Sequence, residues 1–202
     1  MRKTVLIMFG MALAAMSPAF AQSSAPFSTA ALVTAETLPP IGWVQFCGEN
    51  AADCDVQSLP ARAALLDDRR WRQLVRINRE VNDAIEPVSD LEHWGVLEKW
   101  SYPTDGKGDC EDYVLEKRKR LMDAGWPRQA LLITVVRDKK GDGHAILTVK
   151  TDRGDFVLDN QEPRVKAWTE SGYRFVKRQS AEHPNKWVSL GGVDPGIITA
   201  NR

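Results

Sequence analysis

The sequence has 202 residues, of which 43% are hydrophobic and 27% are charged, an ordinary composition for a soluble globular protein. It excludes a disordered tail, a collagen and a polytopic membrane protein. Lys plus Arg equals Asp plus Glu at 27 each, so the formal charge is zero and the basic excess of an electrostatic nucleic-acid binder is missing. Seven tryptophans predict a core or a groove that is built on large rings.

The N-terminal residues 1–21 have the pattern of a secretory signal peptide. A basic start is followed by an apolar run over residues 5–15 and by an Ala-x-Ala cleavage site that ends at Ala21. The apolar run is shorter than the roughly 20 residues that a membrane span needs. The sequence therefore predicts export to the periplasm or beyond the cell, with cleavage near Ala21.

Composition divides the remainder into a leader and one domain. Residues 22–40 are rich in Ser, Ala, Thr and Pro, which predicts a flexible leader. Residues 41–202 are then expected to form a single domain, and a chain of this length can bury a sizeable core.

Three cysteines follow the leader. Exported proteins occupy oxidising compartments, where thiols form disulfides. Cys47 and Cys54 are seven residues apart in a stretch of Gly, Asn and Asp that can turn back on itself, so we expect a local disulfide between them. The alternative is a pair of metal ligands, but no second Cys/His pair lies nearby. Cys110 is left over, as a buried residue, an intermolecular partner or a reactive thiol.

Hydrophobic periodicity predicts helices first and strands afterwards. A helix opens at Asp67–Asp68 and ends before Pro87, and a long connection over residues 88–109 follows it. A second helix runs from Cys110 to Ala124, and Gly125 suits the position after its end. Five strands are expected in the rest of the chain, over residues 131–136, 144–149, 156–158, 173–179 and 186–190. This order indicates an α+β fold with an antiparallel sheet.

Cys110 lies where a Gly-rich loop, residues 106–109, becomes a helix. Backbone N–H groups and the positive end of the helix dipole point there, which favours a thiolate. A nucleophilic cysteine also needs a base and a group that orients the base.

His144 and Asp159 are the predicted base and orienting acid. If residues 151–154 form a four-residue hairpin loop, residue 150 faces residue 155, and His144 and Asp159 share a face one diagonal step apart. A two-residue loop would place them directly opposite, and a three-residue loop would put them on opposite faces. Taken singly, each has a structural alternative, namely a buried cysteine, a surface histidine and a turn-forming aspartate.

Three segments together resemble the bacterial transglutaminase-like cysteine proteinases. They are Gly108-Asp109-Cys110-Glu111-Asp112-Tyr113, Gly143-His144-Ala145 and Leu158-Asp159-Asn160, and the resemblance covers roughly residues 70–190. It implies a papain/transglutaminase-like fold with Cys110 as nucleophile, His144 as base and Asp159 as orienting acid. Two features differ from those family members that release surface adhesins. One is the Cys47/Cys54 pair, and the other is the Gly-His-Ala segment, where Ala-His-Met is typical of those members.

The resemblance also implies a cofactor and partners. The family includes periplasmic LapG-type proteases, which release large surface adhesins and are sequestered by a membrane receptor that senses cyclic di-GMP. In those members the residues that match Asp109 and Glu111 hold calcium, so a Ca²⁺ site is expected here. Calcium takes six to eight oxygens, so backbone carbonyls, Asp112 or Asp142 would have to add ligands. The alternative is that these acids only stabilise the N-terminus of the helix.

The predicted function is an exported cysteine endopeptidase that forms a thioester acyl-enzyme. Its oxyanion hole would use the backbone N–H of Cys110 and a second donor, for which Trp100, Trp94 and Gln45 are candidates. The same triad could instead transfer the acyl group to an amine, as in a transglutaminase or amidase. A non-catalytic periplasmic binding module is the third alternative.

Overall fold

The computed structural model describes residues 30–191, and the predicted signal peptide lies outside this range. The helices are α1 (Ile41–Glu49), α2 (Ala51–Cys54), α3 (Asp68–Ala84), α4 (Asp90–Trp94) and α5 (Cys110–Asp123), with short 3-10 helices at η1 (Arg128–Ala130) and η2 (Trp168–Glu170). The strands are β1 (Val33–Thr37), β2 (Glu86–Pro87), β3 (Lys107–Gly108), β4 (Leu131–Arg137), β5 (Gly143–Thr151), β6 (Gly154–Leu158), β7 (Lys166–Ala167), β8 (Arg174–Gln179) and β9 (Trp187–Leu190). None of the helices in this range is both long enough and apolar enough to cross a membrane.

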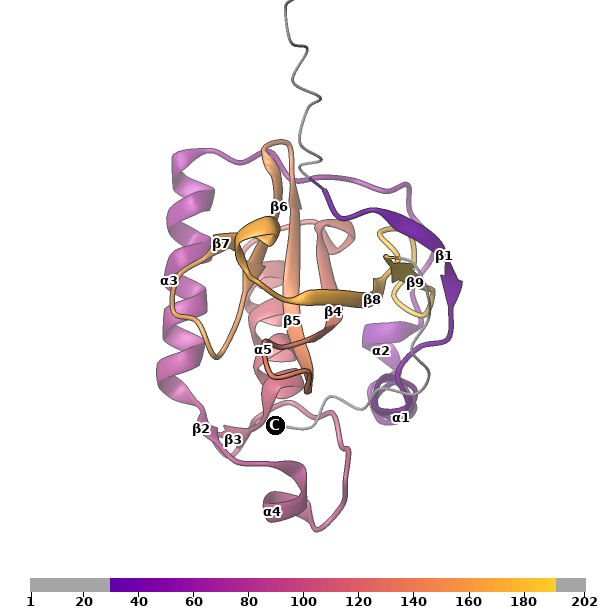
Figure 1. Cartoon of the computed structure of the whole chain (residues 1–202), viewed down its shortest axis with the longest axis vertical. Coiled ribbons are helices and arrows are strands. Elements are labelled where there is room, and N and C mark those ends of the chain that lie inside the picture. The colour runs from indigo at the N-terminus through magenta and orange to yellow at the C-terminus, as the bar shows by residue number, and fades with distance from the viewer. Residues whose placement is uncertain (1–29, 192–202) are drawn as a thin grey trace, which may run out of the picture.

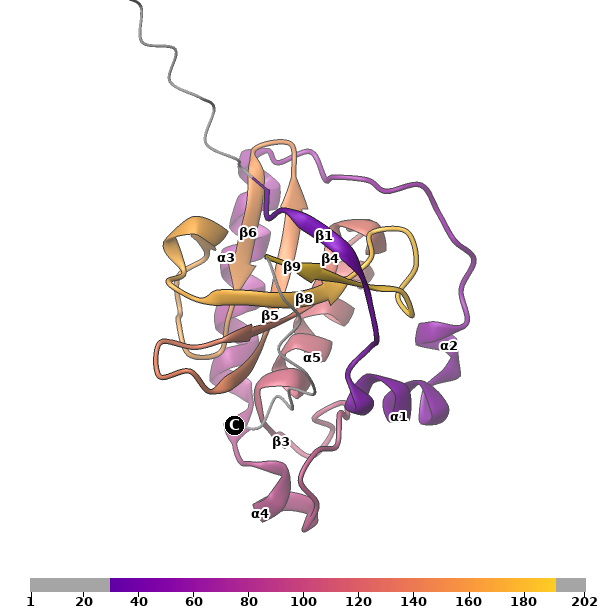
Figure 2. The same ribbon diagram turned by 45° about the vertical axis from the view of Figure 1, so that its right-hand side comes forward.

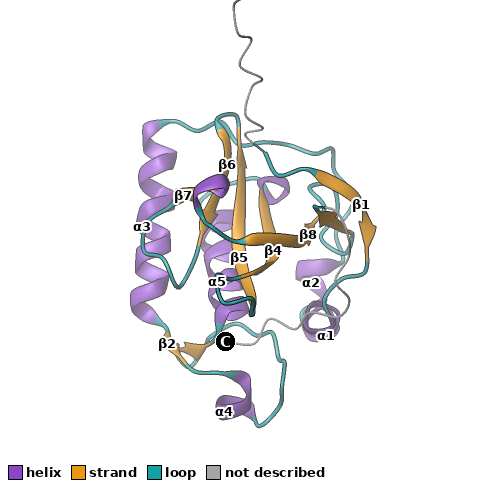
Figure 3. Cartoon of the chain, in the orientation of Figure 1, coloured by secondary structure: helices purple, strands orange, loops and turns teal. Residues whose placement is uncertain are grey.

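Seven strands form one antiparallel sheet in the order β1-β9-β8-β4-β5-β6-β7, which confirms the predicted α+β plan. Figures 1 and 2 show α3 and α5 against one face of this sheet, where the larger apolar core lies. A smaller cluster that includes Val136, Ile146 and Val157 covers part of the other face. Strand β5 is almost fully buried because it lies between these two clusters. Figure 3 shows long loops between α2 and α3 and between α4 and β3.

The two long helices begin and end where local chemistry predicts. Asp67 caps α3 by accepting a hydrogen bond from the Arg70 N–H at 2.7 Å. Helix α5 ends before Gly125, whose φ of +84° is the left-handed conformation that glycine adopts without strain. The N–H groups of Gly125 and Trp126 then donate to carbonyls in the last turn of α5.

The hairpin of β5 and β6 has the register predicted from a pairing of residues 150 and 155. Lys150 lies opposite Asp155, and Leu147 lies opposite Leu158. The ladder extends one pair further than expected, to Thr151 and Gly154. This register places residues 144 and 159 on the same face of the sheet, at its end.

The predicted flexible leader over residues 22–40 is wrong for its last part, because residues 33–37 form strand β1. The segment supplies the outer strand of the sheet by pairing with β9, with Val33 opposite Leu190 and Thr37 opposite Trp187. Its mostly exposed side chains fit an edge strand, and the strand depends on a partner about 150 residues away that no local pattern reveals.

The stretch between Cys47 and Cys54 is mostly helical, and it carries the expected disulfide. Cys47 of α1 and Cys54 of α2 are joined, with their Cα atoms 5.6 Å apart. Asn185, in the β8–β9 turn, accepts a hydrogen bond from Trp43 Nε1 at 3.1 Å and donates to the Cys54 carbonyl at 3.2 Å. The disulfide-bonded helices α1 and α2 are therefore hydrogen-bonded to the turn between β8 and β9.

Three tryptophans of the core confirm that large rings fill it. Trp43, Trp100 and Trp187 are each at most 1% exposed, and their ring centroids lie 6.1 to 6.5 Å apart. Gly42 of α1 makes this packing possible, since a Cβ there would lie 2.3 Å from Trp100 Cδ1. The cluster holds α1 against the loop that leads to α5.

Removing the disulfide should lower the free energy of unfolding by about 2 to 3 kcal/mol, because a crosslink with a sequence separation of 7 restricts only a short loop of the unfolded chain. The comparison is between urea unfolding of Cys47→Ser/Cys54→Ser and of the parent, both with Cys110→Ala to prevent thiol exchange. A loss below about 0.5 kcal/mol would contradict a stabilising role.

Candidate active site

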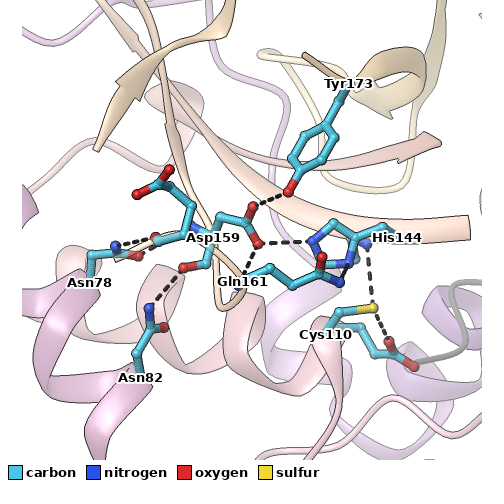
Figure 4. A network of polar contacts seen from close by, with 10 residues as sticks. Asn78, Asn82, Cys110, His144, Asp159, Gln161 and Tyr173 are labelled. Atoms are coloured by element: carbon cyan, nitrogen blue, oxygen red, sulfur yellow. Dashed lines mark hydrogen bonds and ion pairs between the residues drawn. The ribbon is translucent and has the colours of Figure 1, made fainter. Parts of the chain in front are cut away.

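Cys110 is the first residue of α5, and its side chain is fully buried. The Ala145 N–H of β5 points at Sγ from 3.4 Å, and the thiol donates to Glu111 Oε2 at 3.1 Å. Figure 4 shows the sulfur of Cys110 close to His144. The packing of α5 on β5 therefore brings a thiol at a helix N-terminus to the strand that carries the predicted base.

His144 lies near the start of β5 and is also fully buried. Its Nε2 lies 2.9 Å from Asp159 Oδ1, and its Nδ1 lies 3.5 Å from Gln161 Nε2. Asp159 directly follows β6, so the β5–β6 register makes this contact. The structure thus brings the three predicted residues Cys110, His144 and Asp159 into one connected site (Figure 4).

Asp159 is held by hydrogen bonds from several elements. The Gln161 N–H donates to Oδ1 at 3.0 Å, and the Tyr173 hydroxyl donates to Oδ2 at 2.5 Å. Two asparagines of α3 hold its backbone: Asn78 Oδ1 accepts from the Asp159 N–H at 3.2 Å, and Asn82 Nδ2 donates to the Asp159 carbonyl at 2.9 Å. The orientation of the carboxylate is therefore fixed at both the backbone and the side chain.

The histidine and the aspartate form a buried ion pair. Burial alone would lower the pKa of His144, but hydrogen bonds to Asp159 and Cys110 outweigh it and raise the pKa to about 10. Burial opposes ionisation of Asp159, yet the hydrogen bond from His144 holds its pKa below the usual value. Both shifts favour an imidazolium beside a carboxylate.

Three buried carboxylates form a second cluster beside Cys110. Asp90, Asp109 and Asp112 each offer an oxygen within 4.8 Å of the others. Asp109 and Asp112 are among the calcium ligands that the sequence predicts. Asp90 escaped that prediction, because it begins a helix of five residues inside the long connection and has no regular spacing to Cys110.

Of the other predicted ligands, Glu111 lies beside the cluster, where its Oε2 accepts from the Cys110 thiol and its Oε1 accepts no hydrogen bond from the described residues. Asp142 lies in the β4–β5 turn, where its backbone N–H donates to Asp138, and it is outside the cluster.

The electrostatics of the cluster fit a cation. Burial, together with the neighbouring carboxylates, raises the pKa of Asp109 to about 6 and that of Asp112 to about 8. One oxygen of each, Asp109 Oδ1 and Asp112 Oδ2, accepts no hydrogen bond from the described residues. Buried, unpaired carboxylate oxygens that converge are the donors that hard cations such as Ca²⁺ prefer. Asp90, Asp109 and Asp112 are therefore the residues that could hold a metal.

The three side chains predicted as candidate donors to an oxyanion are either already hydrogen-bonded or exposed. Trp100 is buried, but its Nε1 already donates to Glu98 Oε1 at 2.8 Å. Trp94 is 43% exposed on α4, and Gln45 is exposed on α1. A backbone donor, the Ala145 N–H, does contact the thiol, at 3.4 Å.

Comparison with known proteins identifies related sequences and folds. The family model described as bacterial transglutaminase-like cysteine proteinase matches residues 33–194. A structure of LapG from Legionella pneumophila is 24% identical, with a TM-score of 0.50, over 60% of this chain and 70% of that chain. Its calcium-bound form is 25% identical, with a TM-score of 0.50, over 62% and 75%. No curated protein matches the sequence.

The His144–Asp159 pair predicts how stability depends on pH. The raised pKa of His144 adds stability that is complete below its unfolded value of 6.5 and is lost as the pH rises through about 10. The lowered pKa of Asp159 adds stability above 3.8 that is lost as the pH falls below that value. Asp159→Asn should therefore lower the free energy of unfolding most near pH 6, by about 3 kcal/mol, and less at pH 10.

Urea unfolding of both proteins at the two pH values measures this difference. Asp105→Asn is the matched control, because Asp105 pairs with His93 at 2.8 Å but is 49% exposed, so its loss should be below about 1 kcal/mol. An equal loss at pH 6 and pH 10 for Asp159→Asn would exclude the ion pair.

Proposed function

The chain belongs to the family of bacterial transglutaminase-like cysteine proteinases, and we propose that Cys110, His144 and Asp159 are its catalytic triad. It has the fold of that family and is a transglutaminase-like cysteine peptidase that acts on a protein substrate. The observation that carries the proposal is the buried His144–Asp159 hydrogen bond of 2.9 Å beside a thiol at the N-terminus of a helix.

In the proposed reaction, the Cys110 thiolate attacks the carbonyl carbon of the scissile peptide bond and forms a C–S bond. The His144 imidazolium gives its proton to the leaving amine, which departs as the C–N bond breaks. His144 then removes a proton from water, the hydroxide attacks the thioester, and the thiolate leaves. Asp159 keeps the imidazole oriented and stabilises its positive charge. Because Cys110 is fully buried, the surface above it must open to admit a peptide.

We extend the proposal to location and substrate on sequence grounds. The signal pattern of residues 1–21 supports a periplasmic or secreted protein. From the sequence resemblance to LapG-type proteases, we propose a large surface adhesin as the substrate and an inner-membrane receptor for cyclic di-GMP as the regulator.

Calcium is the proposed cofactor, supported by the calcium-bound relative and by the acidic cluster. Asp90, Asp109 and Asp112 would hold the ion. Its charge would offset the negative carboxylates beside Cys110 and so favour the thiolate. The same residues join α4 to the start of α5, because the Asp90 N–H donates to Asp109 Oδ2 at 3.3 Å.

Substitution of the triad tests the peptidase. The wild-type protein, incubated with a peptide library in calcium, should generate new N-termini that mass spectrometry detects. Cys110→Ala and His144→Ala should lower cleavage at least about 10³-fold, and Asp159→Asn by a similar order, because each removes a chemical role. Lys119→Met, on the exposed side of α5, is the control and should cleave normally.

A second arm of the same experiment adds a primary amine, which competes with water for the thioester. Hydrolysis without incorporation of the amine supports the endopeptidase. Incorporation of the amine by the wild type alone would assign the triad to acyl transfer instead.

Calcium binding should release protons, because a pKa of about 8 leaves Asp112 mostly protonated at pH 7. Calorimetry in two buffers with different ionisation enthalpies should find about one proton released per ion at pH 7 and fewer at pH 9. Asp112→Asn should weaken binding at least tenfold and abolish this release, whereas Asp142→Asn, outside the cluster, should behave as the wild type. Proton-independent binding, or no binding, would contradict this site.

A further inference from the structure

One tyrosine contacts both the acid and the base of the proposed triad. The Tyr173 hydroxyl donates to Asp159 Oδ2 at 2.5 Å, whereas Oδ1 of the same carboxylate faces His144. The ring of Tyr173 also packs edge-on against the imidazole, with centroids 5.6 Å apart and planes at 70°. Figure 4 shows the phenol pointing at the far oxygen of Asp159. No sequence pattern indicates this contact, because Tyr173 only begins an expected strand.

The backbone before β8 holds this tyrosine in place. Gly172 has a φ of +74°, a conformation that other residues rarely adopt. The Ser171 hydroxyl accepts from the Tyr173 N–H at 3.3 Å and donates to the Trp168 carbonyl at 2.7 Å. A Cβ at Gly172 would lie 3.0 Å from Lys139 Cε, in the β4–β5 turn. The turn between η2 and β8 is therefore shaped to present the phenol to Asp159.

The phenol cannot itself serve as a base at neutral pH. Burial and the adjacent Asp159 carboxylate both hold the pKa of Tyr173 well above its usual value. The hydroxyl therefore stays protonated and can donate to Asp159 at every pH at which the protein is folded. Such a donor favours the ionised carboxylate and restricts its rotation.

We propose that Tyr173 is a positioning residue of the catalytic centre, which locks the Asp159 carboxylate so that its other oxygen holds the His144 imidazole in line with Cys110. This inference rests on the proposed function of the triad. Without the hydroxyl, Oδ2 has no donor among the described residues, and the carboxylate can turn away from His144. Small errors in the placement of a base reduce the rate of a reaction strongly.

Tyr173→Phe tests the proposal, because it removes the hydroxyl and keeps the ring that packs on His144. We expect kcat for peptide cleavage to fall about tenfold with KM unchanged, since one hydrogen bond to a charged group is lost. The low-field proton resonance of the His144–Asp159 hydrogen bond should broaden or disappear. That NMR signal does not depend on activity, so its change in a protein that cleaves nothing would support the positioning role and refute the proposed function.

Two further variants separate positioning from stability. Tyr102→Phe removes another tyrosine–aspartate hydrogen bond, that to Asp53 at 3.1 Å, away from His144. It should lower the melting temperature without changing kcat or the NMR signal. Gly172→Ala keeps the hydroxyl but strains the turn that presents it, and should lower kcat in the same way as Tyr173→Phe. A Tyr173→Phe protein whose kcat is within twofold of Tyr102→Phe, with its low-field signal intact, would overturn the proposal.

Discussion

The packing of α5 against β5 is the constraint on which the site depends. Helix α5 buries Val114 and Leu121 completely, and β5 is buried on both faces, so neither element can shift without opening the core. Each fully buried side chain of this size contributes about 2 kcal/mol by leaving water. Because Cys110 begins the helix and His144 lies near the start of the strand, the same apolar contacts that stabilise the fold also set the distance between the thiol and the imidazole.

Burial stabilises the apolar core, but it is unfavourable for the charges of the acidic cluster. Burial raises the pKa of each of its three carboxylates and makes the ionised form costly. Backbone N–H groups offset part of this cost: Lys99 donates to Asp90, and Ser101 donates to Asp112 at 2.8 Å. The long loop before α5 is thereby organised around charges rather than around apolar side chains. A rigid apolar core and a loop organised by buried carboxylates thus meet at Cys110.

Sequence patterns predicted the parts of the molecule that depend on local chemistry. The helix that begins at Cys110 follows from spacing and from Gly125, and the meeting of His144 with Asp159 follows from hairpin register. The missed parts depend on partners far along the chain. Strand β1 is short and mostly exposed, and it exists because β9 pairs with it. Asp90 lies beside Asp109 only because a long loop folds back. Tyr173 reaches Asp159 only because of the turn that precedes β8. No periodicity marks either residue.

The fold of α1 and α2 also bears on how the chain acquires its disulfide. Three cysteines allow three pairings, and two of them would consume the thiol that the proposed chemistry needs. In an unfolded chain, closing the short loop between Cys47 and Cys54 is favoured over a loop to Cys110, which is about eight times longer, by roughly 2 kcal/mol of entropy. The native pairing is therefore statistically preferred while the chain is still unfolded. Once α5 has packed, burial of Cys110 shields its thiol from oxidants and from disulfide exchange, so formation of the Cys47–Cys54 disulfide and preservation of the free thiol are compatible in one small domain.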